Sequence, residues 1–449
     1  MKTILILGAG LSASSMIRYL LNASNKEGWQ LRIVDRELSR VEKLIEGFSS
    51  AKALAFNALQ REERIGEIKN ADLVISMLPA RFHVDIAKDC ISLRKNLITP
   101  SYISDEMNAL DQEAKAAGIV IMNEIGVDPG IDHMSAMKII DHIKEIGGKL
   151  HSFKSFCGGL VAEEYDDNPW RYKFTWNPRN VVLAGKGGTA MFQDNHEFKY
   201  IPYNRLFDRL DRITIPNHGK FVGYPNRDSL SYKKTYGLDG IATLYRGTLR
   251  RPNFCKGFNV FIELGMTDDS FPMTNAEKLR PRDFLNAFLP YIPNLSVEQK
   301  FKYFLREDRM YLYEQFEWLG VFGADQDFGF EGATPAQLLE KLMVRKMSLS
   351  EDDKDMLVMY HEFEFEHNGK AKKIVSSMIN IGEDQTYTAM ANTVGLPIAI
   401  GAKMVLNGVL QEKGVALPIN KEIYEPILSE LSTHGIVFNE EELEIQQHV

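Results

Sequence analysis

Hydrophobic and polar residues alternate along the first third of the chain in blocks that match strands and helices. Uninterrupted apolar runs predict parallel strands, because a strand covered on both faces loses its polar alternation. Such runs occupy residues 3–7, 31–34, 71–78, 96–99 and 119–122. Helical stretches separate them, among them 83–93 and 107–117, and Gly118 follows as a helix-ending residue. This order predicts a doubly wound parallel α/β sheet.

A glycine-rich turn joins the first predicted strand to the first helix. Residues 8–13 read Gly-Ala-Gly-Leu-Ser-Ala, and the next strand ends at Asp35, 22 residues after Ala13. This is the G-x-G-x-x-A pattern of a dinucleotide-binding Rossmann domain, in which the helix N-terminus faces the pyrophosphate. A Rossmann-like domain that binds no nucleotide is the alternative. Asp35 suits the free ribose of NAD, whereas Arg36 can hold the 2′-phosphate of NADP, so we expect NAD and keep NADP open.

The pattern changes after residue 130. A helix is predicted over residues 134–146, and short alternating segments follow, such as 150–156 and 259–264. These segments predict an α+β domain on a mostly antiparallel sheet. Residues 266–355 are more charged and carry helix signals, and residues 354–367 alternate again like a strand.

We therefore expect three parts in the chain. Residues 1–130 form the Rossmann domain, which residues 388–430 complete, because the small residues of segment 388–408 let a helix approach closely. An α+β substrate-binding domain takes residues 131–265 and 356–387, and residues 266–355 form a small helical insertion. The acidic run Glu440–Glu444 is expected to be a solvated tail.

Composition narrows the class of protein. The chain has 449 residues, 44% hydrophobic and 25% charged, with a net charge of −8, which argues against a nucleic-acid or anionic-membrane partner. No continuous apolar run reaches the ~18 residues of a membrane span, and no signal peptide is recognised. Its three cysteines, Cys90, Cys157 and Cys255, form no C-x-x-C pair and no closed disulfide set, so we expect a reducing cytoplasm and no metal site.

Candidate chemistry gathers at the predicted carboxyl ends of the strands, where open α/β sheets bind ligands. Three segments fall there: 77–79, 99–102 and 123–133. The last joins acids and a histidine, although an inter-domain linker with Asp132 as a helix N-cap is the alternative.

The α+β domain adds residues that suit an anionic substrate. Arg227, Arg246 and Arg250 can each bind a carboxylate by a two-pronged contact, or else form structural salt bridges. Cys157 lies between an apolar strand and two glycines, where buried packing competes with chemistry.

Together, the motifs of this chain resemble those of the L-glutamate-forming saccharopine dehydrogenases, which are also named saccharopine reductases. The resemblance rests on segments that occur in family order along nearly the whole chain: 8–10, 74–79, 99–102, 123–133, 157–160, 167–169, 224–229, 246–250 and 393–397. It implies that saccharopine is oxidised with a nicotinamide cofactor and water to L-glutamate and 2-aminoadipate 6-semialdehyde, or the reverse. Lysine metabolism and a homodimer are implied as well. Because it has an acid at position 35, the chain is more similar to the NAD-linked, lysine-degrading branch of the family. Residues 300–375 match the family only loosely.

The resemblance and the motifs together nominate the site residues. Substrate contacts carry over to Ser101, Tyr102, Asp128, Arg227 and Thr248. Candidates for proton transfer are Asp128, Tyr102, Cys157 and His133, and the sequence does not choose between them. The expected cofactor contacts are Gly8, Gly10, Leu11, Ser12, Ala13, Asp35, Arg36, Leu78, Pro79 and Ile125.

Two other functions fit parts of the sequence. One is a sister enzyme of the carboxynorspermidine-synthase type, which also condenses reductively but acts on a polyamine. Its site needs more acids and fewer arginines than segments 224–229 and 246–250 provide. The other is a dinucleotide-binding sensor without catalysis.

Overall fold

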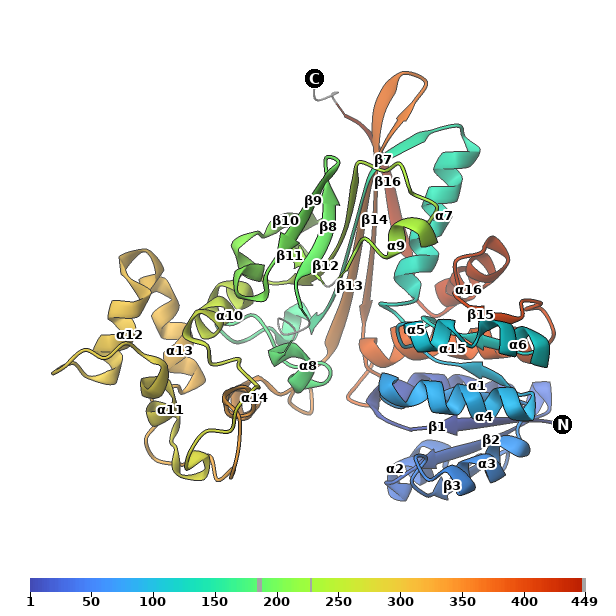
Figure 1. Ribbon diagram of the computed structural model, residues 1–449, viewed down its shortest axis with the longest axis horizontal. Helices are drawn as coiled ribbons and strands as arrows, with labels where there is room; N and C mark the ends of the chain where they lie inside the picture. The colour runs from blue at the N-terminus through green and yellow to red at the C-terminus, as the bar shows by residue number, and fades with distance from the viewer. Residues whose placement is uncertain (184–187, 227, 446–449) are drawn as a thin grey trace. The chain divides into compact units, whose positions relative to one another are not determined.

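The computed structural model describes residues 1–183, 188–226 and 228–445, and the chain separates into two compact units. The first unit joins Met1–His151 to Met359–Val449, and the second is the continuous segment Ser152–Val358. Figure 1 shows the ribbon of both. The domain bounds expected from the sequence stay a prediction.

The first unit contains a seven-stranded sheet in the order β15-β6-β5-β4-β1-β2-β3, with parallel pairing between all neighbours. Its strands are β1 (Lys2–Leu7), β2 (Trp29–Asp35), β3 (Ala51–Ala55), β4 (Leu73–Ser76), β5 (Asn96–Ile98), β6 (Val120–Met122) and β15 (Gly414–Ala416). The doubly wound fold expected from the sequence is confirmed. Strand β3, which the apolar pattern did not predict, has no buried residue along its length.

Helices cover both faces of this sheet. Alternate strand residues such as Leu5 and Leu7 share a core with residues of α3, α4 and α6, so the intervening Ile4 and Ile6 face the opposite side. Helices α1 and α15 lie side by side (Figure 1). The helices of this region are α1 (Ser14–Glu27), α2 (Leu38–Ile45), α3 (Arg61–Lys69), α4 (His83–Leu93), α5 (Asp105–Asn108), α6 (Asp111–Ala117) and α15 (Ala389–Leu406).

Helix α15 packs close because it is built from small residues. A Cβ added at Gly395 would lie 2.8 Å from the backbone N of Met16, and one added at Gly401 would lie 2.6 Å from Ile125 Cδ1. The expected return of this segment onto the N-terminal region is confirmed. The helix has the length and hydropathy of a membrane span, contrary to the apolar-run count, but 78% of that window is buried inside the fold. Burial on this scale is typical of a core helix.

The rest of the first unit contains α7 (Ile131–Glu145), α16 (Lys421–Thr433), the strands β14 (Lys370–Ile381) and β16 (Phe438–Glu444), and the part of β13 (Asp355–His367) from Met359 onward. The expectation that Glu440–Glu444 is a solvated tail was wrong. These residues form an edge strand antiparallel to β14, in which Glu442 pairs with Lys372 at 2.6 Å and Glu444 with Lys370 at 2.8 Å. Opposite charges on facing strands favour this pairing over a free tail.

The second unit contains the strand order β10-β11-β12-β7, with β8 paired to β12 and to β9. Its strands are β7 (Lys149–Val161), β8 (Ala190–Asp194), β9 (Glu197–Ile201), β10 (Asp211–Ile215), β11 (Gly219–Pro225) and β12 (Thr243–Arg250). The pairings are antiparallel except for the parallel pair β12–β7. This agrees with a mostly antiparallel α+β sheet.

A helical region in the second unit packs around a large apolar core that includes Trp170, Phe261 and Phe316. Its helices are α8 (Pro178–Val182), α10 (Pro252–Leu264), α11 (Pro281–Phe288), α12 (Val297–Leu305), α13 (Tyr313–Leu319) and α14 (Pro335–Met347), and the short helix α9 (Tyr232–Thr235) of the same unit has no residue in this core. The strand predicted over 259–264 was wrong, because it is the second half of α10. Pro252 begins that helix, Gly265 ends it, and Phe254, Phe258 and Phe261 share its buried face.

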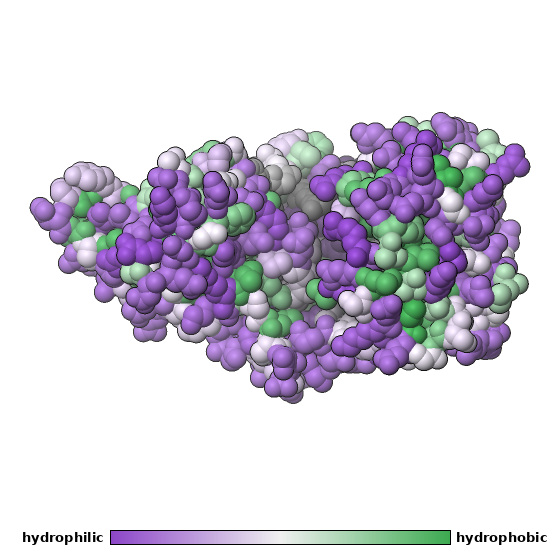
Figure 2. Space-filling view, turned by 90° about the horizontal axis from the view of Figure 1, so that it is seen from below, coloured by the Kyte–Doolittle hydropathy of each residue, from purple (hydrophilic) through white to green (hydrophobic). Residues whose placement is uncertain are grey.

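Hydrophilic residues cover most of the face drawn in Figure 2, with hydrophobic residues gathered in smaller patches between them. The charged fraction of 25% agrees with such a surface.

Candidate active site

The glycine turn has the geometry that a dinucleotide needs. Gly8 has φ of +98°, and a Cβ there would lie 3.3 Å from Leu78 Cδ2, so only glycine fits without strain. A Cβ built at Gly10 meets nothing within 4 Å, and Gly10 is exposed, so its backbone is open to a ligand. Leu11 is exposed, Ser12 is half-buried and Ala13 is buried at the start of α1.

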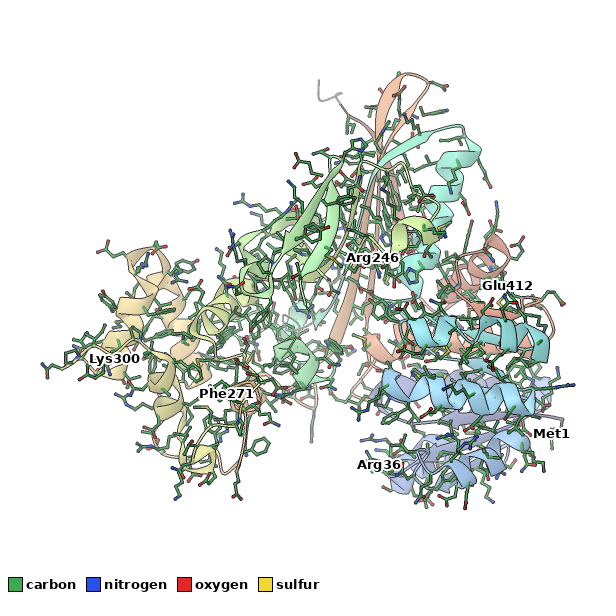
Figure 3. All side chains as sticks on the ribbon, in the orientation of Figure 1. Met1, Arg36, Arg246, Phe271, Lys300 and Glu412 are labelled. Atoms are coloured by element: carbon green, nitrogen blue, oxygen red, sulfur yellow. The ribbon has the colours of Figure 1, made fainter. Side chains whose placement is uncertain are left out.

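Asp35 supports this turn directly. Its Oδ2 accepts a hydrogen bond from the backbone N–H of Ala9 at 2.8 Å, and its Oδ1 accepts one from Glu37 N at 3.0 Å. Arg36 follows as an exposed residue, and Figure 3 shows it at the edge of the sheet opposite to Met1. The end of β2 thus offers both a fixed carboxylate and an exposed cation beside the glycine turn.

Two further residues expected at the cofactor differ in exposure. Pro79 is exposed after β4. The side chain of Ile125 is fully buried, and it lies against α15 at Gly401. A cofactor contact of Ile125 stays a prediction, because the whole residue is 0% exposed.

Tyr102 and Asp128 meet at the carboxyl edge of the seven-stranded sheet. Tyr102 follows β5, Asp128 follows β6, and the Tyr102 hydroxyl donates to Asp128 Oδ1 at 2.9 Å. Both side chains are half-buried, and the Asp128–Pro129 peptide is cis. A phenol donating to a carboxylate is an arrangement that can pass a proton.

A buried acid–histidine cluster lies behind this pair. Glu124 accepts from Ile103 N at 2.8 Å through Oε1, and its Oε2 lies 2.8 Å from His133 Nε2. His133 Nδ1 lies 3.7 Å from Asp132 Oδ2, while Asp132 Oδ1 accepts from Gly130 N at 2.6 Å. All three side chains are at most 2% exposed. The cluster therefore ties the segment that carries Tyr102 to the segment that carries Asp128.

The sequence did not predict the role of Glu124, and the alternative in which Asp132 is a helix N-cap was wrong. The first residue of α7 is Ile131 and its N-cap is Gly130, so Asp132 lies inside the helix and accepts from the cap residue. Glu124 has φ of +53°, an uncommon backbone conformation for a residue other than glycine. The role of Glu124 is visible only in the fold, where its buried carboxylate contacts both Ile103 and His133.

A second residue that sequence reasoning missed is His83, at the start of α4. Its Nδ1 lies 3.0 Å from Ser76 Oγ, and its Nε2 lies 2.8 Å from Ser101 Oγ and 2.9 Å from Thr99 Oγ1. The ring is 2% exposed, and burial lowers its pKa to about 4. His83 is therefore neutral at ordinary pH.

In the second unit, one face of β12 carries the expected substrate residues. Thr248 is paired with Cys157 of β7 and with Tyr224 of β11. Side chains of paired residues share a face, and so do residues two positions apart, so Arg246 and Arg250 lie on this face as well. Cys157 is 8% exposed and Thr248 is half-buried.

Arg250 is a buried cation without a carboxylate partner among the described residues. It is 3% exposed, its Nη1 donates to the carbonyl of Leu249 at 2.7 Å, and its Nε has no partner. Its guanidinium lies over the rings of Tyr172 and Phe254, at 5.4 and 5.9 Å from their centroids. A buried charge is costly unless it is paired, so this arrangement suits an anionic ligand.

Two further arginines were predicted to bind substrate. Arg246, labelled in Figure 3, is 8% exposed, and its guanidinium lies 4.2 Å from the centroid of Tyr232. Arg227 lies outside the described residues. Over the described ranges, no group of three or more His, Cys, Asp or Glu side chains is arranged to hold a metal ion.

Two family models match the chain. The description of the first is "Saccharopine dehydrogenase NADP binding domain", over residues 4–122, and that of the second is "Saccharopine dehydrogenase C-terminal domain", over residues 126–436. The chain belongs to the saccharopine dehydrogenase family. The resemblance drawn from the sequence motifs is thereby confirmed, and so is a nicotinamide dinucleotide as the cofactor class.

Curated relatives from a fungus and a mammal align with nearly the whole chain. Saccharopine dehydrogenase [NADP(+), L-glutamate-forming] of Saccharomyces cerevisiae is 34% identical, over 98% of this chain and 99% of the relative. The mitochondrial alpha-aminoadipic semialdehyde synthase of Mus musculus is 35% identical over 98% of this chain. The chain spans only 47% of that mammalian relative's length.

Solved structures agree with this family. The apo saccharopine dehydrogenase (L-Glu forming) of Saccharomyces cerevisiae superposes with a TM-score of 0.90 at 31% identity, over 99% of this chain and 100% of that one. Homospermidine synthase of Legionella pneumophila in complex with NAD reaches a TM-score of 0.56 at 11% identity, over 98% of this chain and 91% of that one. The second likeness shows a shared fold alone.

Proposed function

We propose that this chain is an L-glutamate-forming saccharopine dehydrogenase of lysine metabolism. It oxidises saccharopine with a nicotinamide cofactor and water to L-glutamate and 2-aminoadipate 6-semialdehyde, or runs the reverse reaction. The observation that carries the proposal is the buried guanidinium of Arg250, which no described carboxylate neutralises. Saccharopine has three carboxylates, and a carboxylate on Arg250 offsets the cost of burying that charge.

The mechanism needs a group that accepts a proton and later assists water. A bound nicotinamide would supply the hydride acceptor for this reaction. On the substrate, loss of hydride from the carbon beside the secondary amine leaves an imine, water adds to the imine, and the carbinolamine collapses to amine and aldehyde. The hydrogen-bonded Tyr102 and Asp128 are the proposed acid–base residues, with Cys157 as a further candidate. His133 is a weaker candidate, because its Nε2 already lies 2.8 Å from Glu124 and its ring is fully buried.

The preference between NAD and NADP is a separate proposal. The carboxylate of Asp35 at the end of β2 repels a 2′-phosphate, which favours NAD. The fungal relatives are named for NADP(+), and the exposed Arg36 supplies a cation that such a phosphate needs. We propose NAD as the preferred cofactor, with NADP accepted less well.

The partners follow from this reaction. Saccharopine, or glutamate with the semialdehyde, is the proposed small-molecule substrate, and no nucleic acid or membrane takes part. A homodimer and a cytoplasmic location stay predictions, and the mammalian relatives carry the word mitochondrial in their names.

Absorbance at the nicotinamide band tests the proposal directly. Purified protein is mixed with saccharopine and with NAD or NADP in parallel, and we expect reduction, faster with NAD. Reduction with NADP alone keeps the reaction and overturns the cofactor preference. If neither cofactor is reduced, and glutamate plus the semialdehyde oxidises neither reduced form, the reaction is wrong. That result would favour the alternative functions, a polyamine-forming enzyme or a non-catalytic dinucleotide sensor.

A further inference from the structure

Three hydroxyl groups from the ends of two neighbouring strands surround the ring of His83. Ser76 is the last residue of β4, Thr99 follows β5, and Ser101 lies two residues further on. The contacts are 3.0 Å from Nδ1 to Ser76 Oγ, 2.9 Å from Nε2 to Thr99 Oγ1, and 2.8 Å from Nε2 to Ser101 Oγ. Ser76 and Thr99 are fully buried, whereas Ser101 is half-buried. Of the three, Ser101 is the one that a ligand can reach.

The position of His83 opposes a charge on the ring. It is the first residue of α4, where the unpaired N–H groups and the positive end of the helix dipole disfavour an imidazolium. Among the described residues, the hydrogen-bond contacts of its ring are to hydroxyl groups alone, so no carboxylate there stabilises a cation. The ring is therefore a neutral group with one N–H donor and one lone-pair acceptor.

We propose that His83 is a positioning residue that fixes the Ser101 hydroxyl as a hydrogen-bond acceptor for the primary amine of the substrate. This inference rests on the proposed function, because Ser101 is a predicted substrate contact. His83 itself, behind Ser101 and 2% exposed, does not touch the substrate.

Hydrogen-bond counting supports the acceptor role in either tautomer. If Nε2 is unprotonated, it accepts one hydrogen bond, from Ser101 or from Thr99, and Ser101 keeps both lone pairs in either case. If Nε2 carries the proton, Ser101 or Thr99 accepts a hydrogen bond from it, and Ser101 keeps at least one lone pair. An ammonium group has three donors and no acceptor, so the remaining lone pair of Ser101 matches it in both cases.

A double-mutant cycle tests the proposal. The variants are Ser101→Ala, His83→Leu, and both together, with His83→Gln as the conservative variant and the exposed His142→Gln as the matched control. We expect Ser101→Ala and His83→Leu each to raise the KM for saccharopine about tenfold, because one hydrogen bond to a charged group is lost. The double variant should lose no more than either single variant, because both remove the same contact.

Two readouts separate positioning from a general structural role. The KM for the nicotinamide cofactor should stay within about twofold, and His83→Gln should recover most of the loss, since its amide can also meet the Ser101 hydroxyl. Effects of His83→Leu and Ser101→Ala that multiply, or a loss that His83→Gln does not recover, would overturn the proposal.

Failure of the proposed function has a different signature, because the parent enzyme then reduces no cofactor with saccharopine. The contact is also read without turnover, from the imidazole nitrogen resonances of His83 in ¹⁵N-labelled protein. Ser101→Ala should shift the Nε2 resonance more than the Nδ1 resonance. An unchanged Nε2 resonance would contradict the contact whatever the reaction.

Discussion

The carboxyl edge of the seven-stranded sheet and the face of β12 both carry polar groups, but they satisfy them differently. At the sheet edge, protein partners meet the buried groups: Glu124 faces His133, and His83 faces three hydroxyls. On β12, the guanidinium of Arg250 meets aromatic rings and a single carbonyl. The comparison teaches that protein contacts satisfy the buried groups of the first region, whereas the second carries a buried charge that we propose a substrate carboxylate pairs with.

Replacing Arg250 by methionine should have the largest effect. We expect kcat/KM for saccharopine to fall about 100-fold or more, because a substrate carboxylate loses a buried partner worth roughly 2–5 kcal/mol. The free energy of unfolding should stay equal or rise by about 1 kcal/mol, since an uncompensated buried charge disappears. Steady-state kinetics and chemical denaturation measure the two quantities on the same preparation.

Arg251 is the matched control for this contrast. It is also buried, but its Nη2 donates to Glu163 at 2.8 Å and its Nη1 donates to two carbonyls. Arg251→Met should therefore lower the free energy of unfolding by about 1–3 kcal/mol and leave the KM for saccharopine nearly unchanged. If Arg250→Met instead behaves like Arg251→Met, the charge on β12 is structural and the comparison fails.

Removing the Tyr102 hydroxyl should have the next largest effect. Tyr102→Phe deletes the donor to Asp128 Oδ1, and we expect kcat to fall about 100-fold as proton transfer loses a positioned group. The cofactor KM should not move. Tyr291→Phe, at an 89% exposed position, serves as the control. An unchanged kcat in Tyr102→Phe would show that this hydroxyl takes no part in proton transfer.

The buried neutral ring of His83 predicts a pH dependence of stability. Its pKa is about 4 in the folded protein against about 6.5 in the unfolded chain, so only the unfolded chain binds this proton between those values. Stability should fall as pH drops from about 6.5 to 4, by about 3 kcal/mol from this residue. His83→Gln should lose that slope in denaturant titrations across this window. A slope equal to that of the parent protein would show that His83 does not titrate as stated.

Asp35 gives the smallest expected effect. Asp35→Asn keeps an oxygen that can accept from Ala9 N, so the glycine turn should persist while the negative charge disappears. The ratio of kcat/KM with NAD to that with NADP should shift about tenfold toward NADP. Glu37→Gln, next to Arg36 and exposed, controls for the loss of one charge in this segment. A parent enzyme that already prefers NADP would refute the role given to Asp35.

The sequence predicted those features that depend on local pattern. The apolar runs placed the central parallel strands, the glycine turn placed the dinucleotide unit, and the small residues of α15 predicted its close packing. It failed at 259–264, where a short apolar stretch fits a strand as well as a buried helix. It failed also at β16, whose pairing depends on lysines about 70 residues earlier in the chain.

The candidate site shows the same limit. Ser101, Tyr102 and Asp128 follow strand ends, so a motif can identify them. Glu124 and His83 act through contacts with residues 7 to 21 positions away, across different strands, and a linear pattern does not reveal such contacts. Arg250 stood among three arginines, and its lack of a carboxylate partner is visible only once its neighbours are known.

The close packing of α15 on α1 has a consequence for biosynthesis. The dinucleotide unit takes its helix α15 and its strand β15 from residues 389–416, whereas the second unit is one uninterrupted segment, Ser152–Val358. During translation, the second unit can complete its core before the edge strand of the first has left the ribosome. The glycine turn is therefore synthesised early, but the sheet that carries it is complete only after β15 has been synthesised.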